Sequence, residues 1–70
     1  MVIRSPMPGT VISIKVAVGD SVKAGDVLLI LESMKIKNEI AAPQDGEVKE
    51  IFAREGMYVK RREPLVAIEG

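Results

Sequence analysis

Glu32-Ser33-Met34-Lys35-Ile36 stands at the junction of two half-chains that repeat each other. Residues of the first half recur in the second half with a constant offset of 37 positions. The matched pairs are Pro6 and Pro43, Gly9 and Gly46, Val11 and Val48, Ile14 and Ile51, Gly19 and Gly56, Val22 and Val59, Leu28 and Leu65, and Glu32 and Glu69. A junction between two copies of a β unit is a turn, and a turn can hold a side chain out in solvent. The repeat therefore predicts that Lys35 lies on an exposed turn.

The pattern within each copy predicts short strands and tight turns, with no helix. Residues 11–18 place Ile12, Ile14, Val16 and Val18 on one parity, the period of a half-buried strand, and residues 47–54 form the equivalent stretch. Residues 27–31 and 65–68 are apolar runs that are too short for helices. Such runs are typical of strands covered on both faces, so we expect these two strands to lie together at the centre.

Special backbone geometry is expected at the turns. Left-handed backbone with positive φ favours glycine, and it is predicted at the matched glycines Gly9 and Gly46, and Gly19 and Gly56. Gly25 aligns with Arg62, so the second copy either uses a different turn there or holds an arginine in a strained conformation. The spacing between Val11 and Ile14 breaks strict alternation and is repeated in the second copy, which indicates a β-bulge in both.

The repeat also predicts the architecture. A unit of about four short strands cannot bury an apolar face alone, so the two copies should pack against each other about an approximate twofold axis. The expected fold class is all-β: a flattened barrel of two four-stranded antiparallel sheets, with pseudo-twofold symmetry and a single domain over residues 1–70. The hairpin that joins the copies should lie at one end of this body, and both termini at the other.

The composition argues against several classes of function. Ten Lys and Arg residues balance ten Asp and Glu residues, and aromatics make up only 3% of the chain, so no nucleic acid partner is expected. Histidine and cysteine are absent, which removes the commonest metal ligands, acid–base group and thiol nucleophile; no catalytic or metal-binding residue is assigned. No run of about 18 apolar residues and no leader-like start is visible, so we expect no direct membrane contact and a cytoplasmic location.

The segment around Lys35 and several turns resemble a known family. Ser33-Met34-Lys35-Ile36, preceded by Glu32 and followed by Asn38-Glu39-Ile40, is similar to the attachment motif of biotinyl domains, the biotin carboxyl carrier domains of biotin-dependent carboxylases and decarboxylases. Further similarity lies in Ser5-Pro6-Met7-Pro8-Gly9, Val18-Gly19-Asp20-Ser21-Val22 and Ala42-Pro43-Gln44-Asp45-Gly46. The resemblance covers essentially the whole chain and implies a barrel-sandwich hybrid fold.

The resemblance implies a role for each residue of this motif. Lys35 would carry covalent biotin, and Glu32, Ser33, Met34 and Ile36 would flank it as the features recognised by biotin protein ligase. That ligase activates the biotin carboxylate as an adenylate, and the neutral lysine amine attacks it to form an amide. The chain would then be a carrier and not an enzyme, a swinging arm that takes up CO2 as carboxybiotin at a biotin carboxylase and delivers it to a carboxyltransferase or decarboxylase.

Three residues depart from the usual motif of the family. Ser33 replaces Ala, Ile36 replaces Met, and Lys37 stands where Glu is common. Lys37 shares the strand parity of Lys35, so spacing alone does not tell the two lysines apart. The resemblance selects Lys35 because it follows Met34.

Alternative functions remain open at this level. A lipoyl domain of a 2-oxo acid dehydrogenase or of the glycine cleavage system resembles this fold, but lipoyl sites usually have Asp before the lysine, where this chain has Met34. A non-carrier interaction domain of the same fold usually interrupts the hairpin with a long helical insertion, which this chain lacks. An enzyme would have to rely on Asp and Glu for acid–base chemistry.

Overall fold

The computed structural model describes residues 1–70 and consists of eight β-strands joined by turns. It contains no helix, and so none that is long and apolar enough to cross a membrane. The strands are β1 (Val2–Arg4), β2 (Gly9–Ile14), β3 (Ser21–Val22), β4 (Val27–Ser33), β5 (Ile36–Ala41), β6 (Gly46–Ile51), β7 (Tyr58–Val59) and β8 (Pro64–Glu69).

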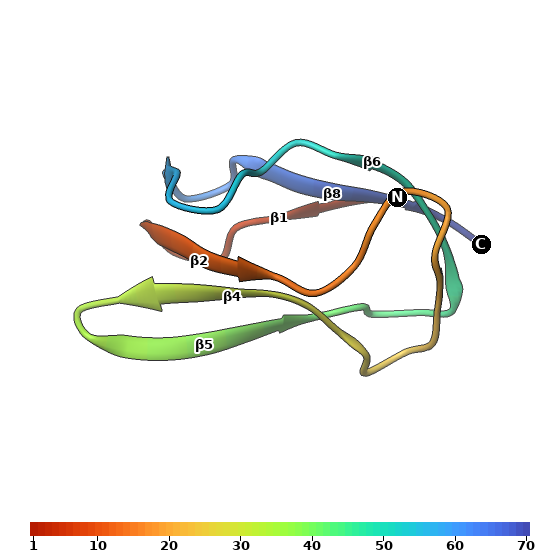
Figure 1. Cartoon of the computed structure of the whole chain (residues 1–70), viewed down its shortest axis with the longest axis horizontal. Helices are drawn as coiled ribbons and strands as arrows, with labels where there is room; N and C mark the ends of the chain where they lie inside the picture. Colours follow the sequence, from red (N-terminus) through yellow and green to blue (C-terminus); the bar gives the residue numbers. More distant parts are fainter.

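The strands form two four-stranded antiparallel sheets, with the orders β1-β8-β6-β3 and β5-β4-β2-β7. The sheets face each other as two layers, with β6, β8 and β1 in one layer and β2, β4 and β5 in the other (Figure 1). Each sheet contains two strands from each half of the chain. The two copies are therefore interlocked, and neither copy owns a sheet of its own.

The strand pairing repeats with the sequence. Val11 lies opposite Leu31 in one sheet, and Val48 lies opposite Ile68 at the equivalent place in the other. Gly9 likewise pairs with Val59, and Gly46 with Val22. Because a shift of 37 positions converts each pair into its counterpart, the two sheets are related by exchange of the half-chains. The predicted all-β fold with two four-stranded sheets and pseudo-twofold symmetry is confirmed.

A β-bulge interrupts β2 and recurs in β6. The register shifts between Val11 and Ser13 in β2 and at the equivalent position, between Val48 and Glu50, in β6. The predicted bulges are therefore confirmed. The predicted parity holds for Ile14 and Val16, which pack against the core, and is wrong for Ile12 and Val18, which are 36% and 63% exposed. Because the bulge adds one residue, Val11 and Ile14 both face the core although they differ in parity. The strand then ends at Ile14, and the apolar residues that follow it belong to a loop.

The core consists of small and medium aliphatic side chains from both sheets. Its members are Val11, Val22, Leu28, Leu29, Leu31, Ile40, Ala42, Val48, Ala53, Val59, Leu65, Val66 and Ile68. As the apolar runs predicted, consecutive residues of β4 and β8 are buried, for example Leu28 and Leu29 at 0% exposure. Both β4 and β8 are inner strands that contribute to the common core, as expected, but they lie in different sheets and are not paired with each other.

The matched glycines serve two different purposes. Gly19 and Gly56 have φ of +97° and +88°, as predicted. Gly9 and Gly46 are not in the left-handed region, so the prediction of positive φ is wrong for them. A Cβ at Gly9 would lie 2.6 Å from the Glu32 carbonyl oxygen, and one at Gly46 would lie 2.5 Å from Ile68 Cγ2. These two glycines are required because neighbouring strands approach too closely for any side chain.

The turns at Gly25 and Arg62 have the same backbone conformation. The Gly25 N–H donates to the Ala42 carbonyl at 2.8 Å, and the Arg62 N–H donates to the Ser5 carbonyl at 2.7 Å. The φ values are +93° for Gly25 and +70° for Arg62. The repeat left open whether the second copy uses a different turn or holds an arginine in a strained conformation. The turn is the same, and Arg62 occupies a backbone conformation that favours glycine.

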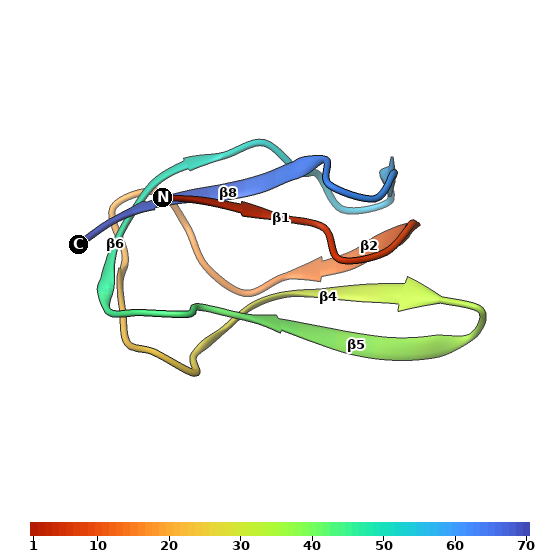
Figure 2. The ribbon, with the colours of Figure 1, turned by 180° about the vertical axis from the view of Figure 1, so that it is seen from behind.

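The hairpin between β4 and β5 and the two termini lie at opposite ends of the molecule, as predicted (Figures 1 and 2). The N-terminal ammonium of Met1 donates to the Ile68 carbonyl at 2.7 Å, and the Ile68 N–H donates back to the Met1 carbonyl at 2.8 Å. The first and last strands therefore close one end of the body and leave the hairpin alone at the other.

Replacing Arg62 with glycine is expected to stabilise the protein. Arg62→Gly relieves a left-handed backbone penalty, while the greater freedom of glycine in the unfolded chain offsets part of the gain, leaving roughly 0.5–1 kcal/mol. Urea and thermal unfolding measure the difference. The matched change Gly25→Ala, at the equivalent turn, should lower the free energy of unfolding by about 1 kcal/mol. A destabilised Arg62→Gly variant would contradict the inferred strain.

Candidate functional site

The hairpin that joins β4 to β5 ends in a two-residue loop. Ser33 pairs with Ile36, so Met34 and Lys35 alone connect the strands. Their φ values are +52° and +67°. Positive φ at both central residues is the signature of a type I′ turn, whose twist matches that of the flanking strands. The predicted exposed turn at Lys35 is thus a tight hairpin loop with little freedom of its own.

The residues in this loop are not those that a type I′ turn prefers. Asn-Gly and Asp-Gly are the usual choices, because they enter the left-handed region at low cost. Met34 and Lys35 are both held there without that advantage. Backbone strain of this kind persists where the side chains serve a purpose other than stability. The loop therefore marks these two residues as a functional site.

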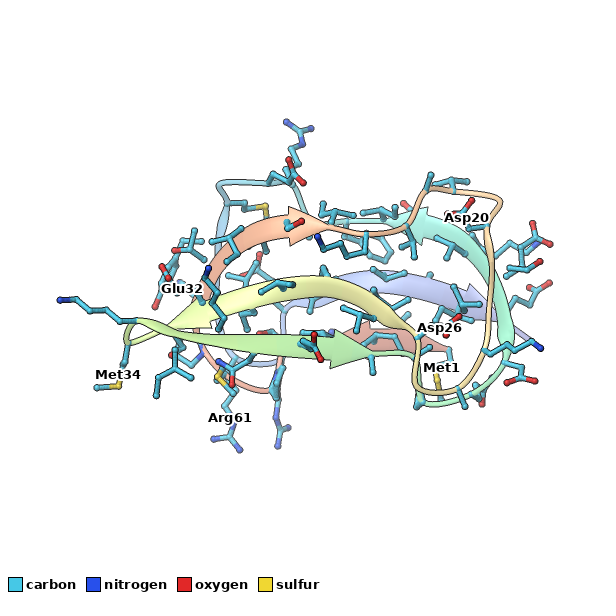
Figure 3. All side chains as sticks on the ribbon, turned by 60° about the horizontal axis from the view of Figure 1, so that its bottom comes forward. Met1, Asp20, Asp26, Glu32, Met34 and Arg61 are labelled. Atoms are coloured by element: carbon cyan, nitrogen blue, oxygen red, sulfur yellow. The ribbon has the colours of Figure 1, made fainter.

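Apolar side chains beside the lysine are left in solvent. Met34 is 91% exposed and Ile36 is 64% exposed, and Lys35 between them is exposed as well. Figure 3 shows Met34 at the extreme tip of the hairpin, away from the barrel. Met34 therefore does not pack over the end of the barrel. An exposed apolar pair at the tip of a hairpin is typical of a surface that another protein covers.

The strands behind the loop hold it in place. Glu32 and Ser33 are half-buried, and Asn38 Nδ2 donates to the Ile36 carbonyl at 3.1 Å and to the Leu31 carbonyl at 3.4 Å. Asn38 thus stabilises the start of β5. Lys37 is exposed and lies opposite Glu32 in the strand register, so it belongs to the hairpin stem and not to its tip.

An open hollow of about 370 Å³ lies against one side of the hairpin. Its lining comes from β2, β4, the hairpin loop and β7: Pro8, Gly9, Thr10, Glu32, Ser33, Met34, Lys35 and Tyr58. Because Gly9 has no side chain, β2 can approach the Glu32 carbonyl closely, and the backbone there forms part of the lining of the hollow. Tyr58 is 62% exposed at the rim.

Sequence reasoning missed Pro8, Thr10 and Tyr58 as neighbours of Lys35. These residues lie far from Lys35 in the sequence and come close to it only in the folded sheet, where β2 pairs with β4 and β7 pairs with β2. One signal was available in the repeat. Tyr58 aligns with Ser21, so an aromatic residue replaces a small polar one at a position where the fold accepts either.

The site presents an amine and little else that is reactive. The single ion pair of the structure joins Lys49 to Glu47 at 3.4 Å, so no carboxylate lies within 4.0 Å of Lys35 Nζ. No group of three His, Cys, Asp or Glu side chains gathers anywhere in the chain. An amine held at a hairpin tip, without a competing partner, is suited to be the acceptor in a reaction that another protein catalyses.

Comparison with known families agrees with this geometry. The profile of the biotin/lipoyl family, described as "Biotin-requiring enzyme", matches residues 1–68. The chain belongs to the biotin/lipoyl family. The resemblance inferred from the motif around Lys35 is confirmed at the level of the family.

Similar curated proteins include a carboxylase subunit, a decarboxylase subunit and a biotin carboxyl carrier protein. This biotin/lipoyl domain is 45% identical over 65 residues to the mitochondrial methylcrotonoyl-CoA carboxylase subunit alpha of Rattus norvegicus, covering 93% of this chain and 9% of that protein. It is 54% identical over 48 residues to the methylmalonyl-CoA decarboxylase subunit gamma of Veillonella parvula, covering 69% and 37%. It is 42% identical over 64 residues to the biotin carboxyl carrier protein of Streptococcus mutans, covering 91% and 49%. The domain thus spans at most about half of these relatives.

The fold is shared with lipoyl domains. The solution structure of the lipoyl domain of the 2-oxoglutarate dehydrogenase complex from Azotobacter vinelandii superposes with a TM-score of 0.85 at 28% identity, covering 100% of this chain and 96% of that one. The architecture of this biotin/lipoyl domain is therefore common to both kinds of carrier, and the residues of the hairpin loop must distinguish them.

Replacing the loop with a preferred turn tests the inferred strain. The double change Met34→Asn with Lys35→Gly is expected to raise the free energy of unfolding by about 1 kcal/mol, because Asn-Gly adopts the type I′ turn readily. Urea unfolding measures the gain, and Met34→Asn alone should give a smaller one. A double variant that is less stable than the natural domain would contradict the assignment of strain to this loop.

Proposed function

We propose that this domain is a biotin carboxyl carrier, with biotin attached through an amide to Lys35. The observation that carries the proposal is the position of Lys35: it follows Met34 in a strained, exposed two-residue loop at the end farthest from the termini. The biotin/lipoyl family and the carboxylase, decarboxylase and carrier relatives support biotin as the attached group. The domain acts as a carrier and leaves the catalysis to other proteins.

The residues at the tip suit the attachment reaction. The neutral amine of Lys35 attacks the acyl carbon of biotinyl-adenylate: the C–N bond of the amide forms, the acyl C–O bond to the phosphate breaks, AMP leaves and one proton is released. A biotin protein ligase supplies the activation, because no side chain near Lys35 can. Met34, Ile36, Glu32 and Ser33 surround the amine as the surface that the ligase recognises, and the exposed Met34 offers it a flexible apolar contact.

Attachment changes the tip in two ways. Amide formation removes the positive charge of Lys35, so the tip no longer resists entry into a dry active site. The lysine and the attached acyl chain form an arm of about ten single bonds, which reaches roughly a dozen ångströms from the backbone. Biotin, when bound, supplies the carboxyl-carrying chemistry of its ring. The rigid hairpin fixes the base of the arm.

The partners follow from this role. A biotin carboxylase loads the arm and a carboxyltransferase or decarboxylase unloads it, and tethering gives each of them a high local concentration of the biotin ring. The relatives are parts of carboxylase or decarboxylase systems, so a partner of this general kind is well supported. A cytoplasmic location stays a prediction.

A lipoyl carrier is the second candidate, because a lipoyl domain has the same fold over its whole length. Both functions need an exposed lysine on a hairpin, which this chain has. The residue before the lysine separates them, since Met34 matches the biotinyl motif and not the Asp usual at lipoyl sites. The carboxylase relatives favour the same choice.

The attachment site can be tested directly. Lys35→Arg is expected to abolish labelling of the domain by a biotin protein ligase with ATP and biotin, because arginine keeps the charge and bulk but cannot form the amide. Streptavidin blotting and intact-mass measurement follow the addition of one biotin. Lys37→Arg is the matched control and should be labelled as efficiently as the natural domain, since Lys37 lies in the strand and not in the loop.

Other outcomes would overturn the proposal. Label that persists on Lys35→Arg and is mapped to Lys37 would refute the site. Failure of the natural domain to accept biotin, together with octanoylation of Lys35 by a lipoyl transferase, would instead establish the lipoyl function.

A further inference from the structure

Three arginines near the hairpin end have no counterpart in the other half of the repeat. With the offset of 37 positions, Arg61 corresponds to Ala24 and Arg62 to Gly25, while Arg4 corresponds to Ala41. The backbone is the same at the equivalent turns, so the fold accepts small neutral residues at these places. Whatever these arginines do, the fold itself does not require it.

The structure gathers these side chains on one surface. Arg4 Nη1 donates to the Arg62 carbonyl at 3.0 Å, which ties β1 to the turn that precedes β8. Lys60 and Arg61 lie in the same turn, and all four residues are exposed. We refer to Arg4, Lys60, Arg61 and Arg62 as the basic cluster.

One acidic residue, Glu63, lies in the same turn, and its carboxylate accepts a hydrogen bond from the Lys60 backbone N–H at 2.9 Å. The one ion pair of the chain lies elsewhere, between Lys49 and Glu47, so none of the four cations has a carboxylate within 4.0 Å. The chain as a whole is neutral, with ten cations and ten anions, so the cluster does not reflect a general excess of positive charge. Like charges held together repel, and Arg62 adds backbone strain at φ +70°. Glu63 offsets only one of the four positive charges, so this surface keeps an excess of positive charge.

The basic cluster adjoins the hollow beside Lys35. Tyr58 lines the hollow and is followed by Val59 and Lys60, and Arg4 is connected by a short turn to Pro8, which lines the hollow as well. Figure 3 shows Arg61 on the same half of the molecule as Met34, with Asp20 and Asp26 toward the other end. A protein that takes up the arm of Lys35 must therefore pass close to the cluster.

We propose that the basic cluster is a docking surface for a carboxylate-rich face of the biotin carboxylase that loads the arm. The inference rests on the carrier function proposed above and adds the surface that orients the carrier. Arginine forks bind carboxylates in a bidentate manner, which favours an acidic protein surface as the partner. The cluster also keeps this end of the domain positively charged after Lys35 has lost its charge. It can therefore steer repeated encounters with the biotin carboxylase.

The repeat itself supplies a variant that the fold tolerates. Arg4→Ala, Arg61→Ala and Arg62→Gly together install the residues of the equivalent positions, and the last change relieves strain. The full chain is biotinylated, one biotin on Lys35 is verified by mass, and a biotin carboxylase that carboxylates the natural domain in trans is assayed with MgATP and bicarbonate. At low salt, kcat/KM for the variant is expected to fall roughly tenfold, with kcat unchanged. Salt should lower the value for the natural domain toward that of the variant.

A matched variant with Lys15→Ala, Lys23→Ala and Lys49→Ala removes the same charge elsewhere and should keep at least half of the natural kcat/KM. The docking proposal is overturned if the two triple variants lose kcat/KM equally, if the basic cluster can be removed without loss at low salt, or if kcat falls instead. Absence of biotin on Lys35 at the mass measurement would refute the carrier function itself, so the two failures are distinguishable.

Discussion

The structure depends on the inability of either half-chain to bury its apolar face alone. Each sheet draws two strands from each half, so the core closes only when both copies are present and interlocked. In a chain of 70 residues, folding buries only about 60% of the surface of the unfolded chain, so the stability available is small. Each backbone device, from the bulges at Val11 and Val48 to the close approaches at Gly9 and Gly46, therefore appears in duplicate.

This symmetry separates structural from functional residues. Where both copies have the same residue, as at Gly19 and Gly56, the fold requires it. Where the two copies have the same backbone conformation but different residues, the fold does not require either residue, and its side chain can serve to bind a partner. Tyr58 beside the hairpin and Arg62 in its strained turn are such differences, and both lie on the half of the molecule that carries Lys35. A comparison of the two copies therefore distinguishes the residues that the fold requires from those that can form a binding surface.

Most of the fold and the exposed position of Lys35 could be predicted from the sequence, because a constant offset and short-range turn signals carry that information. The two sheets, the bulges and the exposed loop at Lys35 follow from local pattern. The burial of Val11 and the exposure of Ile12 could not, since one extra residue at the bulge changes which side chains point inward before Ile14. The exposure of Met34, the reason for Gly9 and the hollow at Tyr58 depend on which strands become neighbours, which is a property of the assembled sheets.

The hydrogen bonds between Met1 and Ile68 have a mechanical consequence. They hold both chain termini at the same end of the molecule, so a polypeptide joined to either terminus is attached to the domain at that end only. When the domain rotates about this end, the hairpin with Lys35 at the opposite end moves the farthest. The principal extent of 32 Å exceeds the roughly dozen ångströms of the side-chain arm, so a rotation of the whole domain displaces Lys35 farther than a movement of the arm alone.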